Sequence, residues 1–165
     1  MAPKNSERKI VERMLLRALS GKGSHVEMEK LFEGLDWQVA GVRPEGVSHS
    51  VYQLLNHIVY WQDWVVKWLG GESPPIPKHA AGSWPGDASP ATPQDWTAAL
   101  RHFHDGLDKL ESSARKTDLF SMRGKKSMLD MLQTIASHNS YHAGQVVEVR
   151  RMLSAWPPPS GGLTW

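Results

Sequence analysis

The stretch that decides the fold lies near the C-terminal end of the chain and reads Ser137-His138-Asn139-Ser140-Tyr141-His142-Ala143-Gly144-Gln145. It falls within a long pattern in which apolar residues recur every three or four positions, as on the inner face of a bundled helix. That face comprises Met131, Ile135, His138, His142, Gln145, Val149 and Met152. Three successive positions of this face are polar. Burying an imidazole costs free energy unless a partner binds it, so a metal ion is the first candidate partner.

Two helical segments are predicted before residue 42. A helix capped by Ser6 runs to about Leu19 and ends at the glycines that follow. Ser24 and Glu27 then form a capping-box pattern that begins a second helical piece. The apolar residues available for packing in this piece are Val26, Met28, Leu31, Phe32 and Leu35. The pattern stops at the turn-like run Arg43-Pro44-Glu45-Gly46.

Three longer helices are predicted after this turn. The first begins near Ser48 or Ser50 and ends at Gly70-Gly71, and its apolar face comprises Val51, Leu54, Ile58, Trp61, Val65 and Trp68. The second begins at Thr92-Pro93-Gln94-Asp95, where a capping threonine precedes a proline and an acid. Its apolar face comprises Trp96, Ala99, Leu100, Phe103, Leu107, Leu110 and Ala114. The third begins at Ser127, carries the histidine stretch and runs to about Ser154.

Residues 70–93 hold six prolines and four glycines, so this segment cannot be regular structure for long. A connection of this length is usually functional or mobile. A domain boundary is the alternative, although neither flank looks able to fold alone. Trp84 and Ile76 indicate that part of the segment packs down, and residues 156–165 are expected to be an irregular tail.

No strand alternation and no internal repeat is visible in the chain. The prediction is therefore an all-α protein with a single domain over residues 1–165. The simplest architecture is a four-helix bundle with an additional N-terminal helix over residues 1–23.

Composition limits the function classes. The chain has 165 residues, a net charge of +2 and no cysteine. This charge is too small to indicate nucleic-acid binding, and the basic cluster of Arg123, Lys125 and Lys126 is expected to be a solvated loop. The absence of cysteine excludes disulfides, thiolate metal sites and a cysteine nucleophile, and it suits a reducing compartment. Without a signal core or a run of about 20 apolar residues, we expect a cytoplasmic protein with no membrane contact.

The spacing of His138 and His142 predicts a metal site. Four residues on one helix separate their Cα atoms by about 6 Å along the axis, so both imidazoles point the same way. Nitrogen ligands at this spacing suit Zn, Ni, Co, Fe or Cu. Two ligands alone bind weakly, and a third must come from another helix. His57 is the best donor because it borders the apolar face of its own helix.

The other histidines are weaker candidates for the third ligand. His102 and His104 flank Phe103, so at most one of them leans inward. His49 lies about 12 Å from His57 if both belong to one helix, and is then too distant to share an ion with it. His25 falls at a helix start, and His79 falls in the loop rich in proline and glycine.

A site of three neutral nitrogens with no carboxylate leaves coordination positions open for water or substrate, which is typical of a reactive site. The competing interpretation is that the two histidines on one helix are core residues held by hydrogen bonds, with no metal. The tryptophans at 61, 64 and 68 are interpreted as core residues and not as a platform for substrate.

The stretch His49-Ser50-Val51-Tyr52-Gln53-Leu54-Leu55-Asn56-His57, together with His138-Asn139-Ser140-Tyr141-His142-Ala143-Gly144-Gln145, closely resembles the DinB/YfiT-like superfamily. The resemblance extends from about Ser24 to Trp156. It implies a bundle with up-down-down-up topology whose second and third helices are joined by residues 70–93. It also implies a divalent metal, nickel or zinc, held by His57, His138 and His142, and it implies a homodimer.

The resemblance leaves the reaction open between thiol-dependent enzymes, in which the metal activates a low-molecular-weight thiol, and metal-dependent hydrolases. Because the chain has no cysteine, a thiolate would have to arrive as a cosubstrate. We therefore expect a metalloenzyme, a thiol transferase or a hydrolase, that acts on a small-molecule substrate. Gln145 or Tyr141 are candidates for orienting the substrate or a ligand histidine.

No aspartate or glutamate shares the inner face with the histidines, and Glu148 is expected to point elsewhere. A hydrolase needs a proton acceptor, so this absence favours thiol activation. The alternative from another class is a non-catalytic helical bundle dimer that binds a metal or a small ligand.

Overall fold

The computed structural model describes residues 5–161, so the last residues of the expected tail, 162–165, lie outside the described part. Its four long helices are α1 (Asn5–Ser20), α3 (Val51–Leu69), α4 (Pro93–Lys116) and α5 (Met128–Met152). The short elements are η1 (Met28–Lys30), α2 (Trp37–Ala40), η2 (Ala80–Ser83) and the antiparallel strands β1 (Met122–Arg123) and β2 (Lys126–Ser127). Between residues 5 and 161, no helix is both long enough and apolar enough to cross a membrane.

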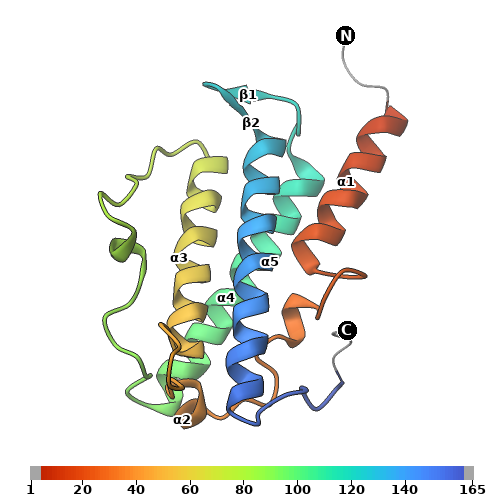
Figure 1. Cartoon of the computed structure of the whole chain (residues 1–165). Coiled ribbons are helices and arrows are strands. Elements are labelled where there is room, and N and C mark those ends of the chain that lie inside the picture. Colours follow the sequence, from red (N-terminus) through yellow and green to blue (C-terminus); the bar gives the residue numbers. More distant parts are fainter. Residues whose placement is uncertain (1–4, 162–165) are drawn as a thin grey trace.

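The long helices form a bundle in which α1 and α5 run in one direction and α3 and α4 run in the other (Figure 1). Helix α3 packs against α4 and α5, and α1 packs against α5 and α4. This confirms the predicted all-α bundle and its up-down-down-up order. The N-terminal helix, expected in addition to the bundle, is one of its four long members.

Side-chain caps begin three of these helices where the sequence predicts them. Ser50 accepts a hydrogen bond from the backbone of Gln53, whose side chain in turn accepts from the backbone of Ser50. Ser127 makes the same reciprocal pair with Asp130, and Thr92 accepts from the backbone N–H of Asp95. Each cap satisfies a backbone donor that has no partner within the helix, which is why the helices start at these residues.

The helical piece predicted from Ser24 is wrong, because that segment forms only the single turn η1 and irregular chain. Gly34 adopts a positive φ of 69°, which ends any helix there. The guanidinium of Arg150 on α5, only 1% exposed, donates to the carbonyls of Leu31, Glu33 and Ala155. The carbonyls that would accept hydrogen bonds within a longer helix therefore accept them from a distant arginine instead.

The connection between α4 and α5 also differs from expectation, since β1 and β2 pair across a turn at Gly124. Arg123 is not a solvated loop residue. Its guanidinium donates to the carbonyls of Trp68 and Gly71 and to the hydroxyl of Ser73. This contact ties the hairpin to the C-terminal end of α3.

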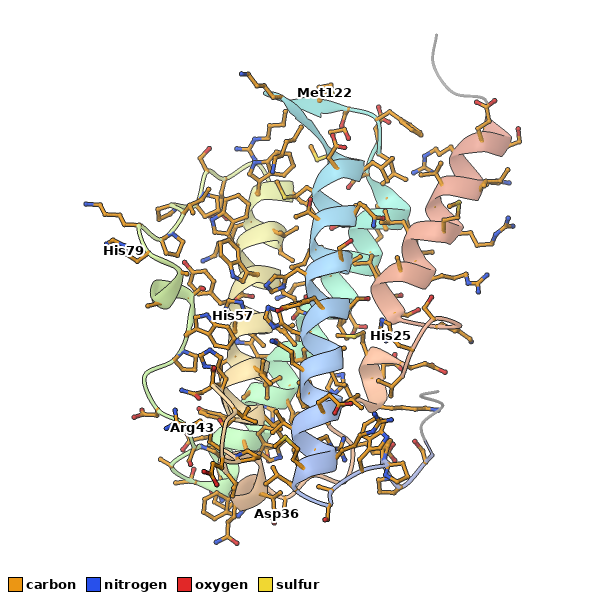
Figure 2. All side chains as sticks on the ribbon, in the orientation of Figure 1. His25, Asp36, Arg43, His57, His79 and Met122 are labelled. Atoms are coloured by element: carbon orange, nitrogen blue, oxygen red, sulfur yellow. The ribbon has the colours of Figure 1, made fainter. Side chains whose placement is uncertain are left out.

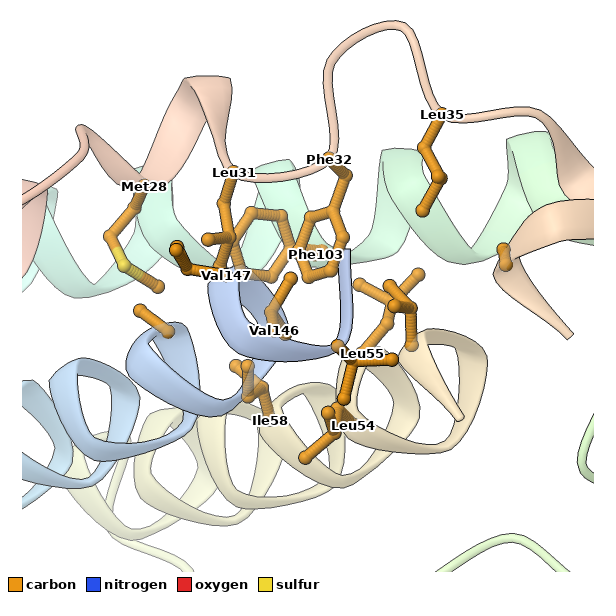
Figure 3. Close-up of a cluster of buried hydrophobic side chains, with 14 of the residues drawn as sticks. Met28, Leu31, Phe32, Leu35, Leu54, Leu55, Ile58, Phe103, Val146 and Val147 are labelled. Carbon is orange, nitrogen blue, oxygen red and sulfur yellow. The ribbon is translucent and has the colours of Figure 1, made fainter. Parts of the chain in front are cut away.

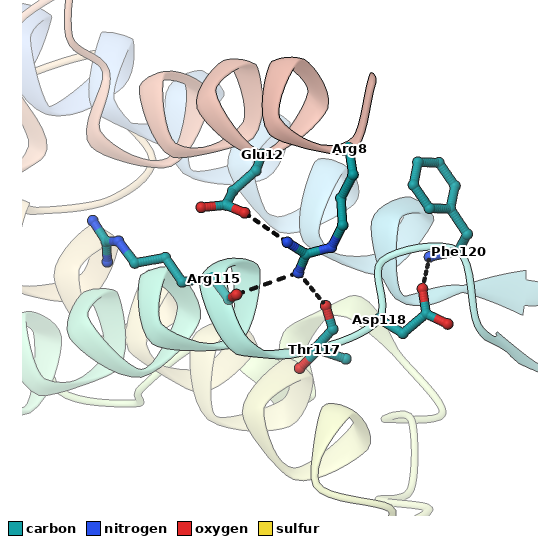
Figure 4. Close-up of polar contacts among 6 residues, drawn as sticks. All are labelled: Arg8, Glu12, Arg115, Thr117, Asp118 and Phe120. Carbon is teal, nitrogen blue, oxygen red and sulfur yellow. Dashed lines mark hydrogen bonds and ion pairs between the residues drawn. The ribbon is translucent and has the colours of Figure 1, made fainter. Parts of the chain in front are cut away.

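Helix α1 is fastened to the C-terminal end of α4 by Arg8. Its guanidinium pairs with Glu12 at 2.9 Å and donates to the carbonyls of Arg115 and Thr117 (Figure 4). Those carbonyls belong to the last turn of α4 and to the capping residue that follows it, where intrahelical partners are missing. These hydrogen bonds thus give the free carbonyls at the end of α4 a partner, and they also hold α1 against the bundle.

The core consists of two apolar clusters. One joins the segment between α1 and α2 to α3, α4 and the end of α5, with Phe32 and Phe103 in an edge-to-face contact (Figure 3). The other joins α1 to the opposite ends of α3, α4 and α5. Two buried amides, Gln62 at 0% exposure and Asn139 at 1%, each lie along their helix between residues of the two clusters. Met152, expected on the inner face of α5, is exposed because a 3.6-residue helix drifts away from a strict seven-residue repeat.

Residues 70–93, called the strap below, run back along α3 and are held to it at several points. The Trp64 indole donates to the carbonyl of Pro75, and the Ser50 hydroxyl donates to the carbonyl of Ala88. Trp84 packs against the core as predicted, whereas Ile76 is exposed. The strap therefore covers the side of α3 that carries His57 (Figure 2).

Candidate metal centre

Three histidines meet between α3 and α5. One ring nitrogen from each of His57, His138 and His142 lies within 4.8 Å of those of the other two. The Nε2 atoms of His57 and His138 are 3.2 Å apart, and the ring of His142 lies 4.7 Å and 4.4 Å from the rings of His57 and His138. The structure thus brings together the three residues that the sequence singled out.

Hydrogen bonds determine which nitrogen is free in two of these rings. Nδ1 of His57 lies 3.0 Å from the carbonyl oxygen of Ser83, and a carbonyl can only accept, so Nδ1 carries the proton. Nδ1 of His142 lies 2.6 Å from Oε1 of Gln145, which is likewise an acceptor. In both neutral rings the lone pair is therefore on Nε2. The strap and Gln145 orient the rings through atoms that do not face the cluster.

His138 completes the set with a weaker orienting contact. Because Nε2 of His57 has no proton, the 3.2 Å contact with Nε2 of His138 requires His138 to donate. Its Nδ1 is 3.5 Å from Oδ1 of the buried Asn139, whose Nδ2 has no partner. Asn139 is thus placed to hold the proton on Nδ1 once the other nitrogen is needed for a ligand.

Burial keeps the three rings neutral. It lowers the pKa of His57 to about 4, and the nearby His142 and His49 act in the same direction while the Ser83 carbonyl opposes it. Burial, with His142 and His57 nearby, also lowers the pKa of His138 to about 4. The pKa of His142 is lowered mainly by burial. Neutral imidazoles are the form that binds a metal, so near neutral pH no proton has to be displaced from a cation.

The donor set fits one divalent ion. In a tetrahedral zinc site with bond lengths of about 2.0–2.1 Å, two ligand atoms are about 3.3 Å apart. The Nε2 atoms of His57 and His138 already lie at 3.2 Å. Among residues 5–161 these histidines are the only group of three or more candidate ligands, and no carboxylate belongs to it.

Aromatic rings form the walls of the centre. Trp61 contacts His57 and His138 edge to face, at 6.5 Å and 6.2 Å between ring centroids. Trp61, interpreted as a core residue, therefore also borders the histidines. Tyr141 lies beside His142 but is 66% exposed, and its hydroxyl is 3.5 Å from Nε2 of Gln145.

Sequence reasoning missed the contribution of the strap. The indole of Trp84 is stacked on His57 at 3.8 Å and, through its other face, on His49 at 3.6 Å. His49 is not on the same helix as His57, because α3 begins only at Val51. His49 lies near the histidine cluster, but the indole of Trp84 separates it from His57. A tryptophan in a loop rich in proline and glycine is a visible sign that the loop packs against the protein. No pattern in the sequence shows that the backbone carbonyl of Ser83 bonds His57.

The remaining histidines lie elsewhere. His102 pairs with Asp63 at 2.9 Å on the surface, and His104 contacts Phe103. His25 lies in the segment after α1, where its Nδ1 donates to the carbonyl of Val26 and its Nε2 accepts from the hydroxyl of Ser140. His79 precedes the strap turn η2. None of these histidines belongs to the cluster.

A family model described as DinB superfamily matches residues 23–146, which is most of the chain. The chain belongs to the DinB superfamily. In this DinB protein the matched range contains the three histidines and Gln145, whereas α1 precedes it. No curated protein and no solved structure matched the chain. The family and the histidine cluster together fit a metal-binding helical protein.

Proposed function

We propose that this DinB protein is a metal-dependent enzyme that activates a small thiol or water with an ion held by His57, His138 and His142. The observation that carries the proposal is the cluster of three neutral imidazoles without a carboxylate. Such a site binds through three nitrogens and keeps coordination positions for a reactant. Nickel and zinc are the metals we assign, since both accept imidazole ligands.

A divalent ion held by the three histidines would act as a Lewis acid and lower the pKa of a bound thiol or water. The chain supplies binding and orientation. Ser83 and Gln145 hold protons on Nδ1 of His57 and His142 and so keep each Nε2 available. Trp61 and Trp84 border the centre with apolar ring surface.

Of the two reactions, we favour activation of a thiol over hydrolysis. Hydrolysis needs a group that accepts a proton from water, and the histidine cluster includes no carboxylate among the described residues. Glu148 is exposed and pairs with Arg151 at 2.8 Å. A thiol is far more acidic than water, so deprotonating it needs less assistance.

The first experiment is the metal content of untagged protein purified without a nickel column. We expect about one ion per chain in the parent and a loss of most of it in His57→Ala, His138→Ala and His142→Ala, because two remaining imidazoles bind weakly. His102→Ala is the matched control, since His102 lies on the surface beside Asp63. A parent that stays empty after incubation with zinc, nickel, cobalt and manganese would show that the histidines are only a hydrogen-bonded network.

The second experiment separates the two chemistries without an activity assay. The protein is loaded with cobalt, and a small thiol such as cysteamine is added. Thiol activation predicts a thiolate-to-cobalt absorption band that disappears in His138→Ala. If the band is absent at saturating thiol, thiol activation is wrong and activation of water becomes the proposed chemistry. A metal-loaded protein that is inactive in both thiol-transfer and hydrolysis screens would instead be the non-catalytic binder.

Three expectations from the sequence stay predictions. These are a homodimer, a cytoplasmic location and the absence of nucleic-acid binding.

A further inference from the structure

A pocket of about 240 Å³ lies between α3, α5 and the residues that precede α3. On α3, Leu54 lies three residues before His57. On α5, Gln145 lies three residues after His142. Three residues are about 4.5 Å along a helix axis, so the pocket begins within one turn of the cluster. Residues 46–49, which precede α3, close its remaining side.

Two residues connect the pocket to the candidate metal centre. Gln145 lines the pocket, and its Oε1 accepts the hydrogen bond from His142. His49 also lines the pocket, and its ring is stacked on Trp84, which is stacked in turn on His57. A molecule in the pocket would therefore lie against Gln145, which orients His142, and against His49, whose ring stacks on the tryptophan that covers His57.

The lining of the pocket limits the chemistry of its occupant. Leu54, Val47, Val149 and Met152 provide apolar surface, and Gln145, His49 and Glu148 provide polar groups. No lysine or arginine lines the pocket. Burial, together with the nearby Arg43, lowers the pKa of His49, so that ring is neutral near pH 7. The one charged lining group is the carboxylate of Glu148, whose partner Arg151 lies outside the lining.

We infer that this pocket binds the body of the substrate, and that the substrate is a small apolar molecule with a neutral or amine-bearing polar end. The inference rests on the proposed function for its link to a reaction, although binding in the pocket does not require a metal. A carboxylate-bearing molecule is disfavoured because no lysine or arginine lines the pocket to pair with it, and the one charged lining group is itself a carboxylate. An anionic thiol cosubstrate would then have to approach the cluster from another side.

The test uses three probes that share one ring and differ in charge: benzylamine, benzyl alcohol and benzoate. Binding to the full-length, metal-free protein is measured by saturation-transfer NMR. We expect dissociation constants in the millimolar range for the amine and the alcohol, as usual for ligands of this size. We expect no saturation transfer to benzoate. Equal binding of benzoate and benzylamine would overturn the assigned substrate class.

Matched variants locate the binding. Met152→Trp places a larger ring at the wall of the pocket and should weaken binding about tenfold. Met122→Trp makes the same exchange at an exposed methionine on the distant hairpin and should change nothing. Glu148→Gln should weaken the binding of benzylamine about two- to fivefold and leave the binding of benzyl alcohol unchanged. Parent-like binding of the alcohol in Met152→Trp would show that the pocket is not the site.

A last measurement keeps this inference separate from the proposed function. With cobalt bound, the protons of benzyl alcohol should relax faster than with zinc, because the pocket lies within one helical turn of the histidines. Binding without this enhancement, in protein shown to contain one cobalt ion, would overturn the link between pocket and centre. If the protein takes up no metal, the proposed function fails, and the metal-free binding data still decide the pocket.

Discussion

Gln145 orients one of the three histidines of the candidate metal centre. Its Oε1 lies 2.6 Å from Nδ1 of His142 and determines which nitrogen of that ring faces the cluster. The sequence placed Gln145 on the same helix face as the histidines, and the structure places its amide oxygen on a ring nitrogen. Its role in metal binding is a prediction that can be measured.

Gln145→Ala should weaken metal binding about 10- to 100-fold, the usual cost of removing such a partner. Gln145→Glu keeps an acceptor at the same position and should retain most of the affinity. Both are measured by titration against a competing chelator. Gln133→Ala is the control, since Gln133 on the same helix bonds only the exposed side chain of Ser137 among the contacts described. If Gln145→Ala binds metal as the parent does, Gln145 does not orient His142.

The buried histidines make stability depend on pH in the metal-free protein. Both His57 and His138 have a pKa of about 4 in the folded chain, against 6.5 for an unperturbed histidine. Between these values the unfolded chain binds more protons than the folded chain. The contribution of these two histidines to the free energy of unfolding is therefore fully present above about pH 6.5 and is lost as the pH is lowered towards 4.

This pH dependence is measured by urea denaturation of metal-free protein at pH 7.5, 6.0, 5.0 and 4.5. The slope should become shallower in the double variant His57→Phe and His138→Leu, which removes two of the titrating groups. A slope unchanged by the double variant would mean that other groups cause the loss of stability in acid.

The cap of α3 also makes a contact outside its own helix. Ser50 is fully buried and makes two contacts, one with the backbone of Gln53 and one with the carbonyl of Ala88 in the strap. Ser127 caps α5 in the same way, but it makes no strap contact among the described hydrogen bonds. Comparing the two serines therefore separates the stabilisation by a helix cap alone from the stabilisation by the additional hydrogen bond to the strap.

Ser127→Ala should lower the free energy of unfolding by about 1 kcal/mol, the usual cost of losing a cap. Ser50→Ala should cost about 2 kcal/mol, because it also leaves the Ala88 carbonyl without its hydrogen bond. Urea denaturation of both variants measures the difference. Equal losses would show that the strap contact does not stabilise the fold.

The elements that could be predicted from the sequence are those with local signals. Ser50, Thr92 and Ser127 begin their helices through contacts with residues only three positions away, so short patterns identify them. The segment after Ser24 has the same kind of pattern but no helix, because Arg150 reaches it from 117 and 119 residues away along the chain. The same holds at the centre. The spacing of histidines on a helix is visible in the sequence, whereas the Ser83 carbonyl and the Trp84 stack depend on where the strap lies.

At the scale of the whole bundle, α4 passes close to α3 at Gly106. Gly106 faces Gln62, and a Cβ atom at this glycine would lie 2.4 Å from its Oε1. Both side-chain atoms of Gln62 that can hydrogen-bond lack a partner. The absence of a side chain at Gly106 is therefore what allows a buried amide and a close helix pair to coexist.

Gly106→Ala should destabilise the protein by about 1–3 kcal/mol, because the added methyl group has no space. Gly144→Ala is the matched exchange in α5, where an added Cβ atom meets nothing within 4 Å, and it should stabilise by about 0.5–1 kcal/mol. Thermal unfolding measures both. The loss at Gly106 should shrink in a Gln62→Ala background, and a loss that stays the same would mean that the clash is not with Gln62.

The stacking of Trp84 between His49 and His57 also has an optical consequence. An indole in face-to-face contact with a candidate metal ligand is an intrinsic fluorophore only a few ångströms from any bound ion. Copper or nickel at the cluster would quench its emission, and detachment of the strap would shift that emission towards the red as water reaches the ring. Trp84 is one of eight tryptophans in the chain, so the part of the emission that Trp84→Phe removes is the part that reports on the centre. That part distinguishes an occupied centre from an uncovered one without an added label.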